Sequence, residues 1–287
     1  MICLIQATYP QLAVAALIRP VATAAVNLSC RRGLCRARSG SRASSALKDL
    51  DPGMRRDDDV QLSVIIPTLN EAGCIQSTLE SLQPLRTRGH EIILIDGGSR
   101  DTTRVLAQPL VDQLLQSAPG RAAQMRTGAT AARGQILWFL HADSHIPPQA
   151  DAIILEALDR ENADWGRFDI TFADTHLLLK CVAWSMNQRS RLTGIATGDQ
   201  GIFVRRPLYD RVGGLPSIPL MEDIRFSRSL KRYSRPCRIT QTLSTSPRRW
   251  RTHGILRTIV TMWGLRLGYF AGISPERLAK YYRVASG

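Results

Sequence analysis

Two short apolar runs, separated by one helix-length segment, most constrain how this 287-residue chain can fold. Residues 62–67 form the first run, which stops at a proline, and residues 91–96 form the second, which stops at two glycines. Short β-branched runs with such boundaries are typical of buried strands. Between them, residues 71–85 carry apolar side chains at helical spacing, namely Ile75, Leu79 and Leu82. The pattern predicts a βαβ unit with parallel strands.

The rest of the chain extends this alternation. Residues 101–115 have the pattern of a second helix, and residues 135–140 have that of another strand. Strands that alternate with helices over this distance predict a Rossmann-like, doubly wound α/β sheet. Further candidate elements are strands at residues 168–172 and 201–205, and helices at residues 177–186, 224–230 and 256–270.

Acidic residues follow three of the expected strands. Glu71 comes just after the first strand, Asp96 ends the second, and Asp143 follows the third. Ligands of doubly wound sheets bind beyond the carboxyl ends of the strands, where loops and helix N-termini converge. Each acid alone has an ordinary interpretation as a helix cap or solvated loop residue. Together, at one edge of the sheet, they predict a site for a polar ligand.

Several nucleotide-binding classes lack their signature here. The first strand is followed by Pro-Thr-Leu-Asn-Glu at residues 67–71, so neither a dinucleotide-binding Gly-x-Gly-x-x-Gly nor a Walker loop is present. A nucleotidyltransferase should also carry a glycine-rich phosphate loop at this position. Nucleic-acid binding is the weakest option, because no recognised motif accompanies the net charge of +14.

Half of that net charge lies in the first 48 residues. This segment is rich in alanine, serine and arginine, contains seven basic residues and has no acidic residue. Its composition is typical of an organelle transit peptide, which predicts a chloroplast or mitochondrial location. A disordered or wrongly assigned leader is the alternative, and the protein would then be cytoplasmic or peripheral to a membrane. Pro10, Arg19 and Pro20 interrupt the apolar stretch that a secretory signal would need.

The leader is followed by a polar linker and one domain. Residues 49–60 contain a Pro-Gly pair among charged residues and are typical of a linker. We expect a single domain over residues 61–287, with a first half at about 61–145 and a second half at about 146–287. Its three cysteines are widely separated, which indicates neither a zinc site nor a disulfide framework.

Five segments of this domain occur in a distinctive order: residues 63–71 (SVIIPTLNE), 95–103 (IDGGSRDTT), 120–128, 141–143 (HAD) and 221–223 (MED). In order and spacing they resemble the motifs of family 2 glycosyltransferases of the GT-A type. The resemblance runs over residues 62–282, and the closest likeness is to a subgroup named for arsenosugar biosynthesis. It implies the GT-A fold and sugar transfer from a nucleoside diphosphate sugar, with inversion and with UDP as the default nucleotide. It also implies a nucleotide-sugar half at about 61–145 and an acceptor half at about 146–287.

The resemblance assigns donor-side roles to the strand ends. Asp143 matches the metal-binding aspartate, and a divalent Mg²⁺ or Mn²⁺ held there would stabilise the leaving diphosphate. His141 stands where the family has a first aspartate, and we interpret it as a structural residue. Arg121 has an alternative interpretation as an exposed loop arginine. The implied donor-binding residues are Pro67, Thr68, Asn70, Glu71, Asp96, Arg121 and Asp143.

Asp223 matches the family's catalytic base, which takes the proton of the acceptor hydroxyl, and Glu222 is its implied support. Without the resemblance, Asp223 has the simpler interpretation of an acid at a helix start. Four more residues are candidates for contact with acceptor or diphosphate: Asp199, Gln200, Arg249 and Trp250. Their alternatives are loop caps for the first pair, and a buried indole beside a surface arginine for the second.

A second class of function is a catalytically degenerate protein that binds a membrane peripherally. The last helix carries Leu256, Val260, Trp263, Leu267 and Phe270 at three-four spacing, with arginines nearby. Such a stripe fits an interfacial helix, or equally a helix packed on the core with a solvated basic face. Both functions can coexist, since the unknown acceptor can be lipid-linked or a small molecule.

Overall fold

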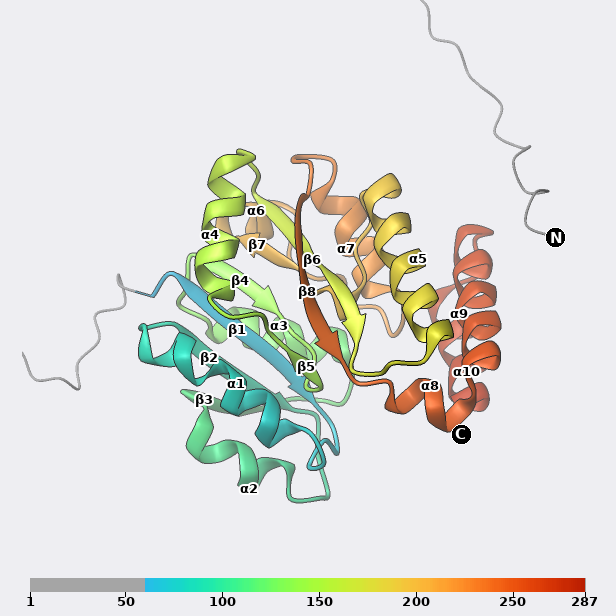
Figure 1. Ribbon diagram of the computed structural model, residues 1–287, viewed down its shortest axis with the longest axis horizontal. Helices are drawn as coiled ribbons and strands as arrows, with labels where there is room; N and C mark the ends of the chain where they lie inside the picture. The colour runs from blue at the N-terminus through green and yellow to red at the C-terminus, as the bar shows by residue number, and fades with distance from the viewer. Residues whose placement is uncertain (1–59, 287) are drawn as a thin grey trace, which may run out of the picture. The chain divides into compact units, whose positions relative to one another are not determined.

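The computed structural model describes residues 60–286, apart from the side chains of Arg249 and of residues 283–286 (Figure 1). The predicted transit peptide at residues 1–48 lies outside the described residues. So does the predicted linker at residues 49–60, except for Val60, which is buried at the start of the domain. The domain boundaries therefore stay predictions.

One mixed eight-stranded sheet forms the centre of the domain, in the order β3-β2-β1-β4-β7-β6-β8-β5. The first four strands are parallel, β7 runs antiparallel to both β4 and β6, and β8 returns parallel to β6. The strands are β1 (Leu62–Thr68), β2 (Glu91–Asp96), β3 (Gln113–Gln116), β4 (Ile136–Phe139), β5 (Ser144–His145), β6 (Trp165–Phe172), β7 (Phe203–Arg205) and β8 (Cys237–Thr245).

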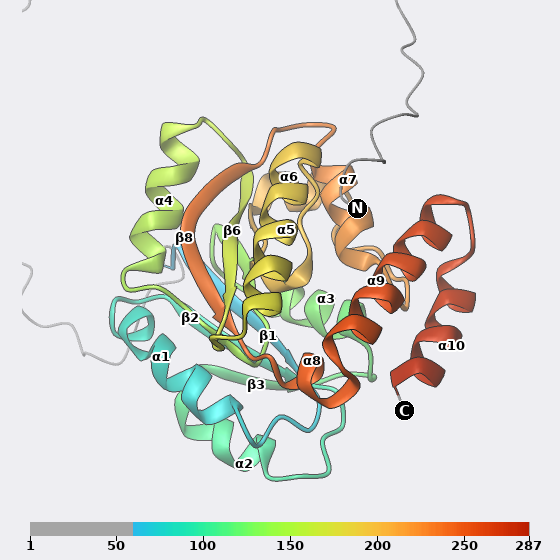
Figure 2. The same ribbon diagram turned by 45° about the vertical axis from the view of Figure 1, so that its right-hand side comes forward.

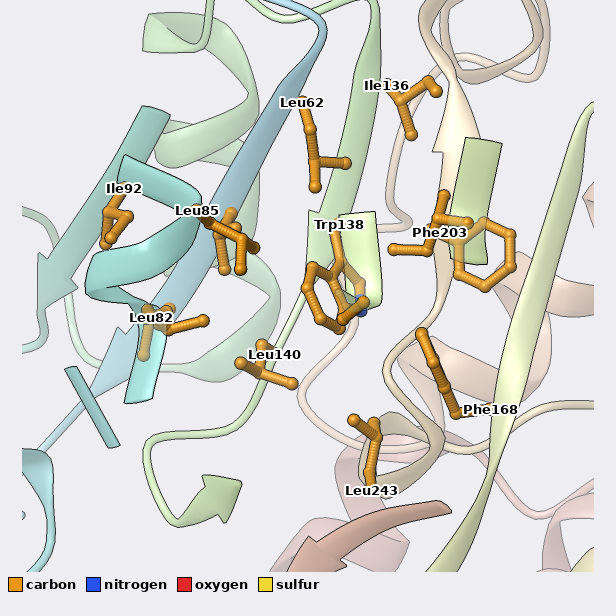
Figure 3. Close-up of a cluster of buried hydrophobic side chains, with 14 of the residues drawn as sticks. Leu62, Leu82, Leu85, Ile92, Ile136, Trp138, Leu140, Phe168, Phe203 and Leu243 are labelled. Carbon is orange, nitrogen blue, oxygen red and sulfur yellow. The ribbon is translucent and has the colours of Figure 1, made fainter. Parts of the chain in front are cut away.

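Helices cover both faces of this sheet. On one face, α1 (Ile75–Thr87) and α4 (Ala150–Arg160) bury their apolar residues against β1, β2 and β4. Figure 3 shows the middle of this core, where Trp138 stacks on Phe168 with ring centroids 5.5 Å apart. The other face is covered by α3 (Arg121–Ala131), α6 (Arg206–Arg211) and α7 (Glu222–Leu230). The predicted doubly wound α/β architecture is confirmed.

The remaining helices lie at the carboxyl end of β6 and β8. Helix α5 (Leu177–Thr193) packs on β6 through Leu179, Ala183 and Met186. After β8 the chain forms α8 (Arg248–His253), α9 (Ile255–Phe270) and α10 (Pro275–Ser286), and Leu265 and Leu278 bring α9 and α10 against α7. Figure 2 shows α5 alongside β6, with α8 and α9 beyond the end of β8.

The helix expected over residues 101–115 is wrong in its second half. Helix α2 spans only Thr103–Ala107, a 3₁₀ turn continues it over Gln108–Leu110, and β3 then begins at Gln113. Proline at position 109 cannot continue a helix. Leu114 packs with one core and Leu115 with the other, which is the two-residue period of a strand. The edge strand β3 and the long strand β8 had no clear signal in the sequence.

The apolar stripe of α9 lies on the surface. Leu256, Val260, Trp263, Leu267 and Phe270 are between 59% and 72% exposed, while Thr258 and Leu265 face the protein. The interpretation of this stripe as a core-packing face is therefore wrong, because helix–helix contacts use the opposite side. Within residues 60–286, no helix combines the length and apolarity needed to cross a bilayer.

Candidate active site

A cavity of ≈400 Å³ is lined by residues that follow β1 and β4 and by residues of α5, α8 and α9. Its polar wall comes from the sheet edge and includes Glu71, Arg121, His141, Asp143 and Asp199. Its apolar wall comes from the later helices and strand ends and includes Phe172, Val182, Met186, Trp250, Ile259, Met262 and Trp263. The cavity is thus divided between charged and apolar surfaces.

Asp143 is the open carboxylate of this cavity. Burial raises its pKa above the ordinary value, and the charges of Asp199 and Glu71 raise it further, against an opposing effect of His141. Within the described residues, its side chain has no hydrogen-bond donor or ion-pair partner. A half-buried carboxylate beside other carboxylates is suited to a hard cation that keeps water or phosphate oxygens as its other ligands.

Glu71 is held by a residue far along the chain. Its Oε2 accepts a bond of 2.5 Å from Nη2 of Arg248, at the start of α8. The Cys74 thiol donates to the same oxygen at 3.2 Å, and burial, followed by Glu71, raises the pKa of Cys74 to about 12. The thiol is therefore protonated and unreactive at neutral pH. The ion pair joins the β1 edge to the C-terminal helices across the cavity.

His141 and Asp199 form a second pair on the cavity wall. His141 Nδ1 lies 3.0 Å from Asp199 Oδ1. A Cβ atom at Gly198 would lie 2.5 Å from His141 Nε2, so only glycine fits there while the ring keeps its position. His141 Nε2 is buried and has no partner within residues 60–286. His141 thus holds Asp199 on the cavity wall, and its structural role stays a prediction.

Asp223 lies in a small cavity of ≈20 Å³ that adjoins the large one and shares Arg121 and His141 with it. Its Oδ2 accepts from the Gly198 N–H at 2.9 Å, and its Oδ1 from the Ile224 N–H at 2.7 Å. Two backbone N–H groups therefore fix the position of this carboxylate.

Glu222 precedes Asp223 at the start of α7 and is 6% exposed. Burial and then the charge of Asp223 raise the pKa of Glu222, although Arg121 opposes this. Arg121 keeps solvent contact through the cavity opening. The surrounding protein disfavours its charge, but Glu222, Asp199 and Asp223 together raise its pKa above the ordinary value. Arg121 is thus a cation shared by the acids of both cavities.

The sequence profile of "Glycosyl transferase family 2" matches residues 63–207, which hold every strand-end motif except the acidic pair at 222–223. The chain belongs to this family. The uncharacterized glycosyltransferase YibD of Escherichia coli K12 is 29% identical over 151 residues, which is 48% of this chain and 42% of that protein. This family 2 member spans about half the length of the curated relatives it matches.

Solved structures support the GT-A fold for this family 2 member. The mannosyltransferase PcManGT of Pyrobaculum calidifontis, in complex with GDP-Man and Mn²⁺, matches with a TM-score of 0.56 at 18% identity, over 83% of this chain and 74% of that one. S. aureus TarS (1–349), in complex with UDP-GlcNAc, matches with a TM-score of 0.54 at 17% identity, over 65% and 58%.

Of the predicted donor residues, Pro67, Glu71, Arg121 and Asp143 line the cavity. Thr68, Asn70 and Asp96 do not, and each holds the sheet edge together instead. Thr68 is buried and its hydroxyl donates to the Ile95 carbonyl. Asn70 accepts from the Arg100 N–H at 2.9 Å, which links the loops after β1 and β2.

Asp96 is fully buried at the end of β2. Its Oδ2 accepts from the N–H groups of Gly98 and Ser99 at 3.0 Å, while its Oδ1 has no partner within residues 60–286. Gln124 of α3 donates to the carbonyls of Thr68 and Ile95. A Cβ atom at Gly97 would lie 3.1 Å from this Gln124 side chain. Gln124 therefore fills the space beside Gly97, where the family usually has a second acid.

Among the predicted acceptor-side residues, Asp199 and Trp250 line the cavity. Trp250 packs edge-on against Phe172, with ring centroids 5.6 Å apart. Gln200 is fully buried, and its side chain closes a capping box with Thr197, which matches the cap alternative. The side chain of Arg249 lies outside the described residues.

Sequence reasoning missed three arginines of the cavity: Arg189 on α5, Arg248 on α8 and Arg266 on α9. Each lies in a segment that the sequence analysis interpreted from its apolar residues or its motif, and not from the arginine. Within the described residues, no cluster of three or more His, Cys, Asp or Glu side chains could hold a metal ion by itself. The prediction of a metal at Asp143 therefore depends on ligands supplied by substrate and water.

Proposed function

We propose that this chain transfers a sugar from a nucleoside diphosphate sugar to an acceptor hydroxyl, with inversion. The observation that supports it best is the arrangement of two differently held carboxylates. Asp143 is open to the large cavity, whereas Asp223 is held by two backbone N–H groups in the adjoining one. Family membership provides the reaction class, and the remaining assignments are ours.

In this proposal Asp143 contributes one oxygen to a divalent cation bound with the donor. Bound Mg²⁺ or Mn²⁺ would neutralise charge on the leaving diphosphate. The fit rests on the unpaired Asp143 carboxylate, whose pKa is raised by burial and by neighbouring acids that a cation would offset. In support, the PcManGT structure contains Mn²⁺ together with GDP-Man.

Asp223 acts as the general base. The acceptor oxygen forms a bond to the anomeric carbon while its proton passes to a carboxylate oxygen of Asp223. The bond from the anomeric carbon to the β-phosphate oxygen breaks, and the nucleoside diphosphate leaves. The two N–H groups that bind Asp223 occupy one lone pair on each oxygen, so acceptor capacity remains. Arg121 offsets the negative charge of this carboxylate, and Glu222 supports its position at the start of α7.

The identity of the donor stays a prediction. The solved neighbours contain two different nucleotides, UDP-GlcNAc in TarS and GDP-Man in PcManGT. We retain UDP as the expected base, and likewise the arsenosugar subgroup and an organelle location as predictions from the sequence. The missing second acid, Gly97, removes one usual contact to the base or ribose.

The test is thermal stabilisation of the full chain by UDP, GDP, CDP and ADP, each with and without Mn²⁺. A ligand at about a hundred times its Kd adds about 2.7 kcal/mol to the free energy of unfolding. We expect a metal-dependent increase in Tm for one base, and its loss in Asp143→Asn. Asp164→Asn, which changes an exposed carboxylate before β6, is the matched control. Stabilisation that persists in Asp143→Asn would remove Asp143 from the donor site.

We also propose that α9 contacts a membrane surface. Its five stripe residues are exposed, and residues 246–275 contain no acidic residue, which suits a bilayer interface. Cosedimentation with vesicles of phosphatidylcholine and phosphatidylglycerol should fall for Trp263→Ser. Val105→Ser removes an equally exposed residue from α2 and should leave binding unchanged. Equal loss in both variants, or no binding by the wild type, would refute this contact.

A further inference from the structure

Arg189 of α5 carries cationic donors that the protein does not satisfy. It lines the large cavity, yet its Nε and Nη2 atoms are buried and have no hydrogen-bond partner within residues 60–286. Buried charged groups are almost always paired, because desolvation of an unpaired guanidinium is costly. Burial and then the charge of Arg266 lower the pKa of Arg189 to about 10.

Arg266 of α9 lines the same cavity from the other side. It is half-buried, and within the described residues it has no hydrogen bond or ion pair. Burial lowers its pKa as well, and the charges of Asp223 and Asp199 oppose this. Two half-buried arginines from different helices therefore line one cavity, and neither forms an ion pair with a carboxylate of the described residues. Repulsion between like charges makes this arrangement unfavourable unless an anion binds.

The surroundings of the two arginines are apolar. On α5, Val182 and Met186 line the cavity two turns and one turn before Arg189, and on α9 Ile259 and Met262 do so before Arg266. The cavity continues past these side chains to Asp143 and Asp199 at the sheet edge. A molecule that fills this part would have an anionic group and an apolar body.

We propose that Arg189 and Arg266 together bind an oxyanion, a phosphate or carboxylate group, carried by the acceptor, whose apolar part lies between α5 and α9. This inference rests on the proposed glycosyl transfer, because it assigns the pair to the acceptor. Both arginines are electrostatically coupled to Asp223, the proposed base. Arg248 is instead coupled to Glu71 and Asp143 on the donor side. Guanidinium groups bind oxyanions through directed, charge-assisted hydrogen bonds.

The probes are octyl phosphate, octanoate, octanol and inorganic phosphate, titrated into the full chain. Trp250 and Trp263 line the cavity and provide a fluorescence signal. We expect octyl phosphate or octanoate to bind at least about tenfold more tightly than octanol. Arg189→Gln and Arg266→Gln should each weaken the anionic probe by about 10- to 100-fold, as for loss of a charge-assisted hydrogen bond. Arg191→Gln changes an exposed arginine on the same helix and should change binding less than about twofold.

The outcomes separate the two sources of the anion. Binding of inorganic phosphate that competes with octyl phosphate indicates a small phosphorylated acceptor, whereas binding of the octyl compounds alone indicates a lipid. Equal affinity for octanol and octyl phosphate, or wild-type affinity in both arginine variants, overturns the inference. Arg189→Lys should recover part of the affinity, because it restores the charge without the fork geometry.

The nucleotide titration distinguishes failure of this inference from failure of the proposed function. If Arg189→Gln keeps the Mn²⁺-dependent stabilisation by nucleotide and loses octyl phosphate, both proposals stand. If the variant loses nucleotide stabilisation and keeps octyl phosphate, Arg189 belongs to the donor site and the inference fails. If the wild type binds octyl phosphate through the arginines but binds no nucleotide, the oxyanion site stands and glycosyl transfer fails.

Discussion

Replacement of Arg189 by Gln should stabilise the protein in the absence of ligand, although it weakens anion binding. The pKa of Arg189 is lowered from 12.5 to about 10. Each pKa unit corresponds to about 1.4 kcal/mol, so the charged form is destabilised in the folded state by up to about 3 kcal/mol. A buried amide in the same place costs about 1–2 kcal/mol. The net gain in the free energy of unfolding is therefore about 1–2 kcal/mol.

The assay is thermal unfolding followed by circular dichroism, in a buffer without phosphate, sulfate or carboxylate. For a domain of this size, about 1 kcal/mol changes Tm by about 2–4 °C. Arg189→Gln should therefore raise Tm by about 2–8 °C, and Arg191→Gln should leave it within about 1 °C. Because the pKa of Arg189 is lowered, the penalty is present at every pH below about 10 and is relieved only above it. The difference in Tm should thus be constant from pH 6 to pH 9.

The opposite result would refute the reasoning. A fall in Tm of several degrees in Arg189→Gln alone would mean that the guanidinium has a stabilising partner in solution. A gain in stability that accompanies loss of octyl phosphate binding is the signature of a binding residue, since functional groups are commonly held at a cost in stability. A purely structural arginine would lose both together.

Three further predictions concern the carboxylates. Asp223→Asn should lower kcat by about 10²–10⁴-fold, the range for loss of a general base, while nucleotide-induced stabilisation persists; equal turnover would remove the assigned base. Gly198→Ala should displace His141, whose Nε2 would lie 2.5 Å from the new methyl group, so the bond to Asp199 should be lost in a crystal structure of the variant. The pKa of Asp143 is raised, so its ionisation destabilises the folded protein as pH rises through that pKa. The affinity for a cation falls as pH is lowered through the same pKa, because the carboxylate becomes protonated. Asp143→Asn should accordingly raise the Tm of the metal-free protein at pH 7 and flatten the pH dependence of Mn²⁺ binding.

The sequence by itself determined the sheet edge. The runs at residues 62–67 and 91–96 are apolar on both faces because each of these strands is covered on both sides, and such a run has few other stable environments. The acids at the strand ends follow from the same topology, because parallel strands bring their carboxyl ends to one edge. For that reason the position of Glu71 and Asp143 at this edge could be predicted from residue order, and the motifs around them indicated the family by resemblance.

Local patterns were less informative where partners come from elsewhere. The sequence predicted the end of a helix where strand β3 lies, because no local pattern indicates that these residues pair with β2. The apolar stripe of α9 has the same three-four spacing whether it packs against protein or lies on the surface. Only the packing of Leu265 against α7 shows which face of the helix is buried. Periodicity identifies an apolar face but not what covers it.

Only the tertiary structure decided the composition of the cavity. Arg248 meets Glu71 across 177 positions of sequence, and Arg189 approaches Arg266 from another helix. Thr68 and Asp96 stand in the expected motifs but are buried at the sheet edge, where they bond to the backbone of neighbouring residues. An arginine in a helix has the same local pattern whether it is solvated or buried. Its role depends on the charges that folding brings within a few ångströms, and these are set by packing rather than by neighbouring residues in the chain.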